Sequence, residues 1–582
     1  MNARPSNRHR RQSGTALLIT TVLTGIALIM MTAVIAYSIS GTKLNSRADQ
    51  YQRAVAAAEG ATEKVVGLIT KDYLNGGEAL VQANLGSYQQ TAPTTADSSF
   101  WNDWHFSDGN GTANSTYVNL ASANSYVVLN STYAGLKGYA STYTVLSNAR
   151  QDGVLQDVVG AVLQQVQLAR VPVFQFAMYS SGDMEISCGQ PFTITGRVHS
   201  NGQLYVEPDN LLTFQSAVTS VGDLLFQRAP LDSRTAPVGS VVYQAPTSSH
   251  VPALTLPIGV TNTLTAVREI IEPPPPGEDP NSPMGRQRYF NQTDMLLVVT
   301  NIGTNVVVTG SSGRFNNFMV PVPTAQLTSF VSTASSFYDS RESKTVQPID
   351  IDVAGLVAWS ATNSNLRNAL GSKDVSSVYV VDGRTLSGSA LGAVRLKNGT
   401  QLPPRGLTVA TGRPLYILGN YNQYNSSNLG TSDTSTSLPA SLAADAITVL
   451  SEGWSDATSA AAVGTRTAAP TTVNSALLAG DVETTATSYS GGMENFPRYL
   501  ETWGLANQFT FNGSMVKMFS SLYATNSWGG TNVYSPPKRV WAYDTNFDNP
   551  TRLPPLTPGL YKVIRSRWAA VRPGQTSVPA TF

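Results

Sequence analysis

Cysteine is almost missing from this 582-residue sequence, where Cys188 is the only one. A single cysteine excludes an internal disulfide framework and every metal site built on paired cysteines. Charged residues are also scarce, at 13% against about 25% in average proteins. Glycine (47 residues), proline (33 residues) and small polar residues take their place. This composition favours an exported, β-rich protein over a cytosolic helical enzyme.

Histidine is scarce as well, with four in the chain. His105, His199 and His250 lack the HxH and HExxH spacings of zinc sites, and His199 within GRVHSNG is expected at a turn. The sequence contains no GxSxG, Walker A or dinucleotide-binding motif. These absences exclude nucleophile-elbow hydrolases, P-loop NTPases and Rossmann enzymes. We therefore predict no catalytic residue, no metal site and no cofactor.

Positive charge is concentrated at the N-terminus. The formal net charge is +1, and Arg4, Arg8, Arg10 and Arg11 contribute +4, so the chain from Thr15 onward carries −3. A chain without basic excess has no general electrostatic attraction for nucleic acid. Nucleic acid is therefore not an expected partner.

A long apolar run follows the basic leader. Thr15 to Thr42 is uncharged over 28 residues, or about 42 Å of helix at ~1.5 Å per residue. Because a bilayer core needs about 20 residues, this run is long enough to span a membrane. The arginines before it, compared with the sparse charges after it, favour a cytoplasmic N-terminus.

Two kinds of cleavable signal are alternatives for this run. A secretory signal has an apolar region of only about 7–15 residues, so the run is too long, although Ala36-Tyr37-Ser38 offers a cleavage site. Arg10-Arg11 suggests a twin-arginine signal, but Gln12-Ser13-Gly14 lacks the apolar residues expected next.

An amphipathic helix continues beyond Lys43. Spacings of three and four, interrupted only at Thr62, define one apolar stripe of Leu44, Ala48, Tyr51, Val55, Ala58, Val65, Ile69 and Tyr73. Asn75-Gly76-Gly77 supplies a stop. We predict one continuous helix of roughly 60 residues, about 90 Å long. Its striped half must be buried against its own head or against neighbouring subunits.

The leader and helix together resemble a known family. RQSGTALLIT, the apolar run and RADQYQRAVAAAEGATEKV are similar to the N-terminus of PilX-type minor pilins over about residues 8–75. Type II secretion minor pseudopilins that lack the usual glutamate are also similar. The resemblance implies that a prepilin peptidase cleaves after Gly14, that Thr15 is then methylated, and that the helices pack into a filament.

Two helix positions bear on assembly. Ile19 stands where main pilins carry glutamate at the fifth mature position, which favours a minor subunit. Glu59, in AAAEG, matches the family's AAE stretch. The implied partners are other pilin or pseudopilin subunits, the peptidase, inner-membrane lipid and a surface glycan bound in adhesion. The implied location is a single inner-membrane pass, with the body periplasmic or extracellular in a filament.

The predicted fold class is an α+β pilin-like head followed by a large, mainly β body. The predicted segments are a leader (1–14), a transmembrane and assembly helix (15–75), a head (76–172), a first solenoid part (173–270), an α+β insertion with a proline-rich linker (271–400), a second solenoid part (401–565) and a loose tail (566–582).

The head and body predictions depend on strand patterns. Tyr139–Leu146 and Val158–Leu168 alternate around Gln151-Asp-Gly153, which predicts a hairpin. Beyond Phe174, short apolar strands recur between turns rich in glycine and asparagine, and near the C-terminus they recur about every 30 residues. This texture favours a parallel β-helix, also called a β-solenoid; a β-sandwich is the competing interpretation. Within the insertion, 351–370 is expected to be helical.

Two functions from other classes remain open. An uncleaved, membrane-anchored adhesin would bind surface glycan through the aromatic residues Trp454, Tyr489, Trp503, Trp528 and Tyr534, unless these cap the solenoid core. A β-helix polysaccharide lyase or hydrolase would need a carboxylate cluster, and the best candidates are Asp445, Asp481, Glu494 and Arg498. Asp544, Asn546 and Asp548 begin like a calcium loop but lack its glycine and glutamate, so a turn is expected.

Overall fold

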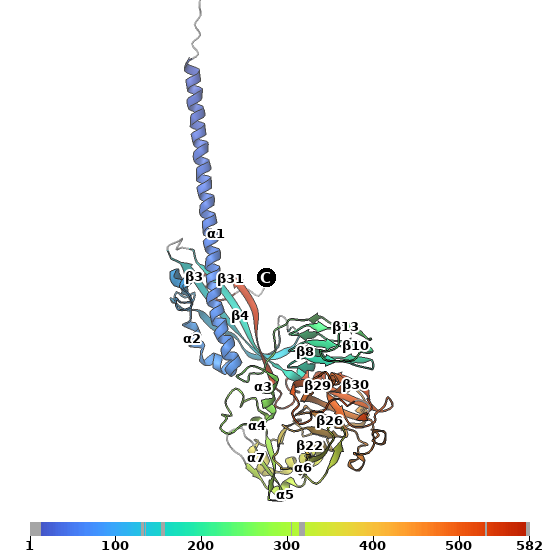
Figure 1. Cartoon of the computed structure of the whole chain (residues 1–582). Helices are drawn as coiled ribbons and strands as arrows, with labels where there is room; N and C mark the ends of the chain where they lie inside the picture. The colour runs from blue at the N-terminus through green and yellow to red at the C-terminus, as the bar shows by residue number, and fades with distance from the viewer. Residues whose placement is uncertain are drawn as a thin grey trace, which may run out of the picture.

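A computed structural model describes residues 13–129, 133, 135–152, 158–303, 305–312, 320–529 and 532–577. It consists of one long projecting helix, a head in which a sheet packs on the C-terminal half of that helix, and a larger body of β-strands (Figure 1). The predicted leader lies outside the described residues, except for its last two.

Helix α1 (Ser13–Ala83) forms the projecting element. No proline interrupts it, so the backbone hydrogen bonds continue through both its apolar and its striped halves. At Gly77 the backbone leaves the helical region, with φ of 68° and ψ of −166°. A Cβ there would lie 3.1 Å from the Tyr561 hydroxyl, so glycine is required for both reasons. The helix is thus kinked at the predicted stop but does not end there, because it resumes and continues to Ala83.

The head sheet is antiparallel, in the order β1-β3-β4-β31, with β2 also paired to β3. Its strands are β1 (Trp104–Ser107), β2 (Tyr117–Val128), β3 (Lys137–Gln151), β4 (Gly160–Pro172) and β31 (Gly559–Ala570), and α2 (Leu85–Gln89) lies between α1 and β1. The predicted hairpin is confirmed by β3 and β4, although Gly153 of its turn lies outside the described residues.

Alternation along the hairpin buries both faces of the sheet. Tyr143 and Val145 of β3 pack with Val65 and Ile69 of α1, whereas Leu146, the next residue of β3, packs in a separate cluster on the other face. Successive side chains of a strand point to opposite faces, which explains the division.

Strand β31 is the main departure from the predicted head. It pairs with β4 from Gly559↔Pro172 to Ala570↔Val162, across nearly 400 positions of sequence. The loose tail predicted for 566–582 is therefore wrong at its start, because 566–570 belong to this strand. No local pattern identifies the partner of a strand so distant in sequence.

The first part of the body has three rows of parallel strands. Each strand pairs with its counterpart one turn later, so that Met178, Val198 and Val218 lie in register at intervals of 20 residues. The rows consist of β5 (Phe176–Ser180), β8 (Arg197–Ser200), β11 (Val218–Ser220) and β14 (Thr247–Ser248); β6 (Met184–Ile186), β9 (Leu204–Val206) and β12 (Leu224–Leu225); and β7 (Phe192–Ile194), β10 (Leu211–Phe214) and β13 (Ser240–Tyr243).

The second part of the body has two principal rows of strands. One row contains β15 (Met295–Ile302), β21 (Ser377–Asp382), β23 (Leu407–Thr411), β25 (Ala440–Ala444), β27 (Thr471–Asp481) and β29 (Gln508–Ser520). The other contains β20 (Lys344–Asp352), β22 (Leu391–Lys397), β24 (Leu415–Leu418), β26 (Ile447–Leu450) and β28 (Pro497–Tyr499). Peripheral strands are β16 (Asn305–Ser312), β17 (Val320–Val322), β18 (Val331–Ser332), β19 (Phe337–Asp339) and β30 (Lys538–Tyr543).

The segment 271–400 does not form a separate insertion. Its strand β15 pairs in parallel with β21, and β21 pairs in parallel with β23. Likewise, β20 pairs in parallel with β22, and β22 with β24. The structure thus differs from the predicted decoration on one side of the body. The helix predicted for 351–370 is present as α6 (Val353–Thr362) and α7 (Ser364–Ala369), with Asp352 capping α6. Three shorter helices are α3 (Leu264–Arg268), α4 (Tyr289–Gln292) and α5 (Thr324–Leu327).

The two parts of the body meet at their first and last strands. β5 pairs in parallel with β29, with Met178 opposite Met515. From this junction the chain runs outward through the first part, from β5 to β14. It then crosses to β15, at the far end of the second part, and returns toward the junction at β29. Because β4 leads into β5 and β31 follows the last body segment, the whole body is inserted between two adjacent strands of the head. Val173 N–H donates to the Pro558 carbonyl oxygen at 3.0 Å where the two crossings meet.

Candidate functional site

The N-terminal half of α1 is apolar and uncovered. Residues 15–49 are exposed, apart from the half-exposed Gly25 and Gly41, and Gln50 is the first buried residue. Ile19 is 55% exposed. Among the described residues, α1 is the one helix long and apolar enough to cross a membrane. The surface that the sequence assigns to the bilayer is thus free of contact with the rest of the chain (Figure 1).

Polar groups on this half are internally bonded. Hydroxyl groups donate to backbone carbonyl oxygens three or four residues earlier at 2.7–3.0 Å, and the donors are Thr20, Thr21, Thr24, Thr32 and Thr42. An unbonded hydroxyl in hydrocarbon costs several kcal/mol, on the order of the loss of a hydrogen bond in an apolar solvent. The frequent threonines therefore do not oppose insertion into lipid.

The processing residues lie at the beginning of α1. Gly14 is within the first helical turn, and Thr15 is exposed. The arginines of the leader lie outside the described residues. Cleavage after Gly14 and methylation of Thr15 remain predictions.

The predicted stripe on α1 is covered over only part of its length. Val55, Ala58, Val65, Ile69 and Tyr73 are buried against the head sheet. Leu44, Ala48 and Tyr51 continue the same stripe but are exposed, Leu44 by 67%. The head therefore leaves three apolar positions of the stripe uncovered.

Thr62, the predicted interruption of the stripe, has a buried partner. Gln164 of β4 donates through Nε2 to Thr62 Oγ1 at 2.9 Å and to Glu63 Oε1 at 2.8 Å. Burial acts to raise the pKa of Glu63, but hydrogen bonds from Arg565 and Gln164 outweigh it and lower that pKa below its ordinary value. The polar pair Gln164-Gln165 within an otherwise apolar strand is a sequence feature from which this contact could have been predicted.

Strand β31 adds two contacts to the same interface. Arg565 Nη2 donates to Glu63 Oε2 at 2.7 Å. Tyr561 stacks on Tyr73 with ring centroids 4.7 Å apart. The end of the chain therefore holds the helix against the sheet. Sequence analysis missed both residues because it placed no strand there.

Glu59 is half-buried on the same helix. Within the described ranges, no hydrogen bond or ion pair engages its side chain. Its neighbour Gly60 lies against Trp101, whose ring carbon would be 3.1 Å from an added Cβ. The structure gives Glu59 no role within the head, so its predicted role in assembly stays a prediction.

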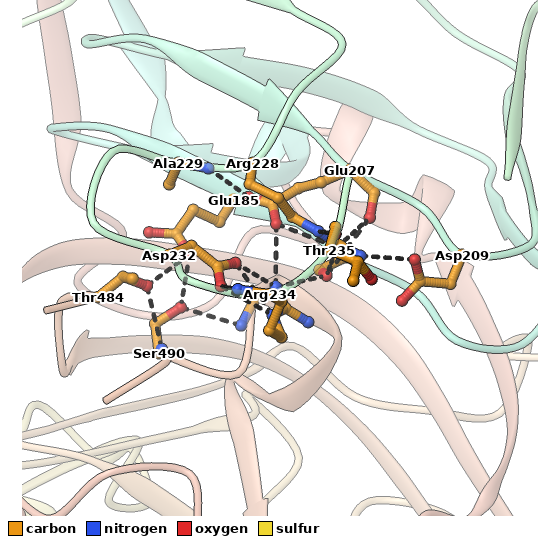
Figure 2. A network of polar contacts seen from close by, with 12 residues as sticks. Glu185, Glu207, Asp209, Arg228, Ala229, Asp232, Arg234, Thr235, Thr484 and Ser490 are labelled. Carbon is orange, nitrogen blue, oxygen red and sulfur yellow. Dashed lines mark hydrogen bonds and ion pairs between the residues drawn. The ribbon is translucent and has the colours of Figure 1, made fainter. Parts of the chain in front are cut away.

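The most extensive polar network in the body joins its two parts (Figure 2). Glu207, fully buried, accepts from Arg234 Nη2 at 3.0 Å, from Arg228 Nη1 at 3.3 Å and from the Ala229 backbone N–H at 3.2 Å. Burial and the nearby Glu185 carboxylate raise the pKa of Glu207 to about 8, against the opposing effect of Arg234.

The network also reaches the loop between β27 and β28. Glu185 accepts from Thr484 Oγ1 at 2.7 Å and from Ser490 Oγ at 2.9 Å (Figure 2). The Arg234 guanidinium lies 3.4 Å from the centroid of the Tyr489 ring. Because these charged groups are bonded to one another, the network holds the first part of the body against the loop between β27 and β28. It does not leave an open binding site.

The four residues considered for polysaccharide cleavage do not form one cluster. Asp445 and Asp481 occupy successive turns of the second part, where the Gly480 N–H donates to the Asp445 carbonyl oxygen at 3.1 Å. The Asp445 carboxylate accepts from Arg268 and from three backbone N–H groups of the 522–524 turn. Glu494 accepts from the Ser187 N–H, and Arg498 pairs with Glu342 at 2.9 Å. Asp445, Glu494 and Arg498 thus each have a structural partner elsewhere, and the Asp481 carboxylate accepts from the N–H of the next residue, Val482.

The other candidates are likewise structural. Asp544 accepts from the Asn546 N–H and from Thr434 Oγ1, which confirms a turn rather than a calcium loop. His199 lies within β8, not at a turn, and bonds Thr219 and Asn201. Among the residues placed by the structure, no group of three or more His, Cys, Asp or Glu could hold a metal ion.

The five aromatic residues considered for glycan binding are not displayed on a face. Trp503 and Tyr534 are buried, and the other three are half-buried, packed against the core or against other rings. The alternative that they cap the core is the one the structure favours.

No protein-family model matches this chain, and neither does any curated protein. Among solved structures, the chain is similar to the crystal structure of competence-associated pilin ComZ from Thermus thermophilus, at 11% sequence identity. The match covers 90% of this chain and 98% of that chain, with a TM-score of 0.28. A TM-score of this size does not establish a shared fold. The functional argument therefore rests on the helix, head and body of this chain.

Proposed function

We propose that this protein is a PilX-type minor subunit of a type IV pilus or related filament. It is cleaved after Gly14, methylated on Thr15 and held in the inner membrane before assembly. The observation that carries the proposal is the exposed apolar half of α1, which ends in a stripe that the head covers only from Val55 onward.

The projecting half has the dimensions of a membrane anchor. Its uncharged stretch of 28 residues is about 42 Å long, compared with a hydrocarbon core of about 30 Å. Ile19 keeps this stretch free of charge where main pilins carry glutamate, which supports a minor subunit. Lys43, the first charged residue after the stretch, suits the membrane–water interface.

Neighbouring subunits are the proposed cover for the rest of the stripe. Leu44, Ala48 and Tyr51 lie beyond the uncharged stretch, so lipid does not account for them, and the head does not reach them. Helices of other subunits, with their own apolar stripes, would bury these positions in a filament.

The body is proposed to be a parallel β-solenoid displayed at the filament tip. Support for the solenoid comes from the parallel pairing of strands 20 residues apart and from the successive rows of the second part. Support for the tip comes from size, because residues 173–558 form one mass on a small head, too large to repeat along a fibre (Figure 1). A non-enzymatic role is proposed because the candidate acids have structural partners.

N-terminal sequencing and intact-mass measurement of the protein from its native membrane test the proposal. A chain that begins at Thr15 with a methylated amino group is expected. Gly14→Val is expected to retain the leader, whereas Gly25→Val is the matched control, because nothing lies within 4 Å of a Cβ at Gly25. A wild-type chain that begins at Met1 would contradict the filament role and leave an uncleaved anchor.

A further inference from the structure

A cavity of about 320 Å³ lies at one corner of the body. The strands β21, β23, β25, β27 and β29 are successive parallel neighbours, so the turns that follow them are stacked in a row. The turns after β21, β23 and β29 contribute lining residues to the cavity. Its lining includes Lys344, Asp382, Arg384, Arg413 and Tyr523, and its volume is in the range of small-molecule sites, about 300–1,000 Å³.

One of its three cations is already neutralised. Arg384 donates through Nε and Nη2 to the two carboxylate oxygens of Asp382, at 2.8 Å each, and through Nη2 to the Gln347 carbonyl oxygen at 2.7 Å. Both side chains of this pair are almost fully buried. Asp382, the one carboxylate in the lining, is therefore engaged by Arg384.

The other two cations have no counter-ion among the residues that the structure describes. Arg413 makes one side-chain hydrogen bond among the described residues, a 3.3 Å contact from Nη2 to the Asp382 carbonyl oxygen. Its guanidinium carbon lies 4.2 Å from the centroid of the Tyr523 ring, which places the group against that ring. Lys344 Nζ has no hydrogen-bond or ion-pair partner within the ranges that the structure describes. Two positive charges thus face one cavity unpaired.

Asp445, a buried carboxylate that bonds the 522–524 turn, does not supply the missing charge. Asp445 accepts from Arg268 Nη1 at 2.7 Å and from the backbone N–H groups of Leu522, Tyr523 and Ala524 at 2.6–3.1 Å. These bonds hold the 522–524 turn that forms one wall of the cavity. Asp445 therefore builds the site instead of neutralising it.

We propose that this cavity binds a sugar acid, a monosaccharide unit that carries a carboxylate. The Arg413 guanidinium, in contact with the Tyr523 ring, offers paired N–H donors that match a planar carboxylate. The side chains of Leu386, Leu391 and Leu522 supply apolar wall for the C–H groups of a sugar ring. An amino-acid zwitterion does not fit, because its ammonium group would need a free carboxylate and Asp382 is occupied. An inorganic anion leaves the apolar wall and most of the volume unused.

Calorimetry or ligand-observed NMR on the detergent-solubilised full chain tests the site with galacturonate and glucuronate. Saturable binding of a sugar acid is expected, with none of galactose or glucose, and with affinity that falls as salt is raised. Arg413→Gln should weaken binding at least about tenfold, because a charge-assisted hydrogen bond contributes more than a neutral one. Lys344→Gln should weaken it by about three- to tenfold. Lys373→Gln, an exposed lysine outside the cavity, should leave it unchanged.

Three outcomes would overturn the proposal. These are no binding of either sugar acid by the wild-type chain, equal binding of the neutral sugars, and full competition by inorganic phosphate, which would indicate a general anion site. If Arg413→Gln fails to fold, the comparison of acidic with neutral sugars on the wild type still decides. Arg413→Lys, which keeps the charge but loses the planar fork, should bind less tightly than wild type and more tightly than Arg413→Gln. The result does not depend on whether the chain enters a filament.

Discussion

The head and the body bury their strands in different ways. In the head, antiparallel strands lie under one helix, and the interface is an apolar stripe with Glu63–Arg565 at its margin, a half-exposed ion pair. In the body, parallel strands pack on one another, and the buried carboxylates Glu207 and Glu494 accept hydrogen bonds from distant segments. The stability of the head therefore depends on the packing of one helix against the sheet. The stability of the body depends instead on hydrogen bonds between many parallel strands and on the pairing of its buried charges.

Removal of β31 is expected to have the largest effect on this comparison. A chain that ends after Pro558 loses Leu560 and Ile564, both buried, together with all pairing to β4. Loss of two such side chains costs more than about 5 kcal/mol, so the head should unfold. Hydrogen–deuterium exchange should show rapid exchange in β3 and β4 but retained protection in the rows of the body. A chain that ends after Arg572 keeps β31 and is the control. Equal loss of protection in β3 and β4 in both chains would contradict the role of β31 in the head.

Substitution within α1 separates the covered half from the uncovered half. Ile69→Ala, at a fully buried position, should destabilise the head by about 2–5 kcal/mol. Ile29→Ala, at a position 69% exposed, should change head stability by less than about 0.5 kcal/mol. Thermal unfolding followed by near-UV circular dichroism in detergent measures both. Similar values for the two variants would mean that the helix is packed differently from the structure.

The pH dependence of the two regions should have opposite signs. Burial raises the pKa of Glu494 in the body to about 7, with Arg539 opposing. A carboxyl group whose pKa is raised by folding stabilises the protein below its ordinary value of 4.5, and that contribution is lost as pH rises toward 7. Glu494→Gln should therefore reduce the loss of body stability between pH 5 and 8 by roughly 2 kcal/mol. Glu483→Gln, at an exposed position, is the control, and an unchanged slope in Glu494→Gln would refute the assignment.

The smallest expected effect concerns the exposed ion pair of the head. Hydrogen bonds from Arg565 and Gln164 lower the pKa of Glu63 against its partial burial, so the pair stabilises the head above pH 4.5 and is lost as pH falls below it. Arg565→Gln should cost less than about 1 kcal/mol at pH 7, because solvent screens the pair. Its effect should shrink as pH falls below 4.5 in acid titrations followed by Tyr fluorescence. An effect that does not change with acid would point to lost packing instead.

The sequence predicts a region well where its contacts join residues that are close in sequence, and poorly where they join distant ones. The stripe from Val55 to Tyr73 and the β3–β4 hairpin are local patterns, and both are confirmed. Strands β4 and β31 pair although they lie hundreds of residues apart, and so do β5 and β29. The sequence of one strand in such a pair does not identify its partner. The candidate site residues Asp445, Asp481, Glu494 and Arg498 were considered as one cluster, but they do not form one. The partners of Asp445, for example, lie in a turn that only the stacked rows bring close to it.

The insertion of the body between β4 and β31 also determines how the molecule bears a load. The two crossings lie at the same end of the sheet, since Pro172 is opposite Gly559. A pull on the body therefore draws β4 and β31 together along their length, parallel to β3. Separation of β4 from β3 then requires the eleven residue pairs between these strands to shear at once. The pairs cannot break one after another from one end. A body that is gripped from outside would transmit its tension through this ladder into the helix that anchors the chain.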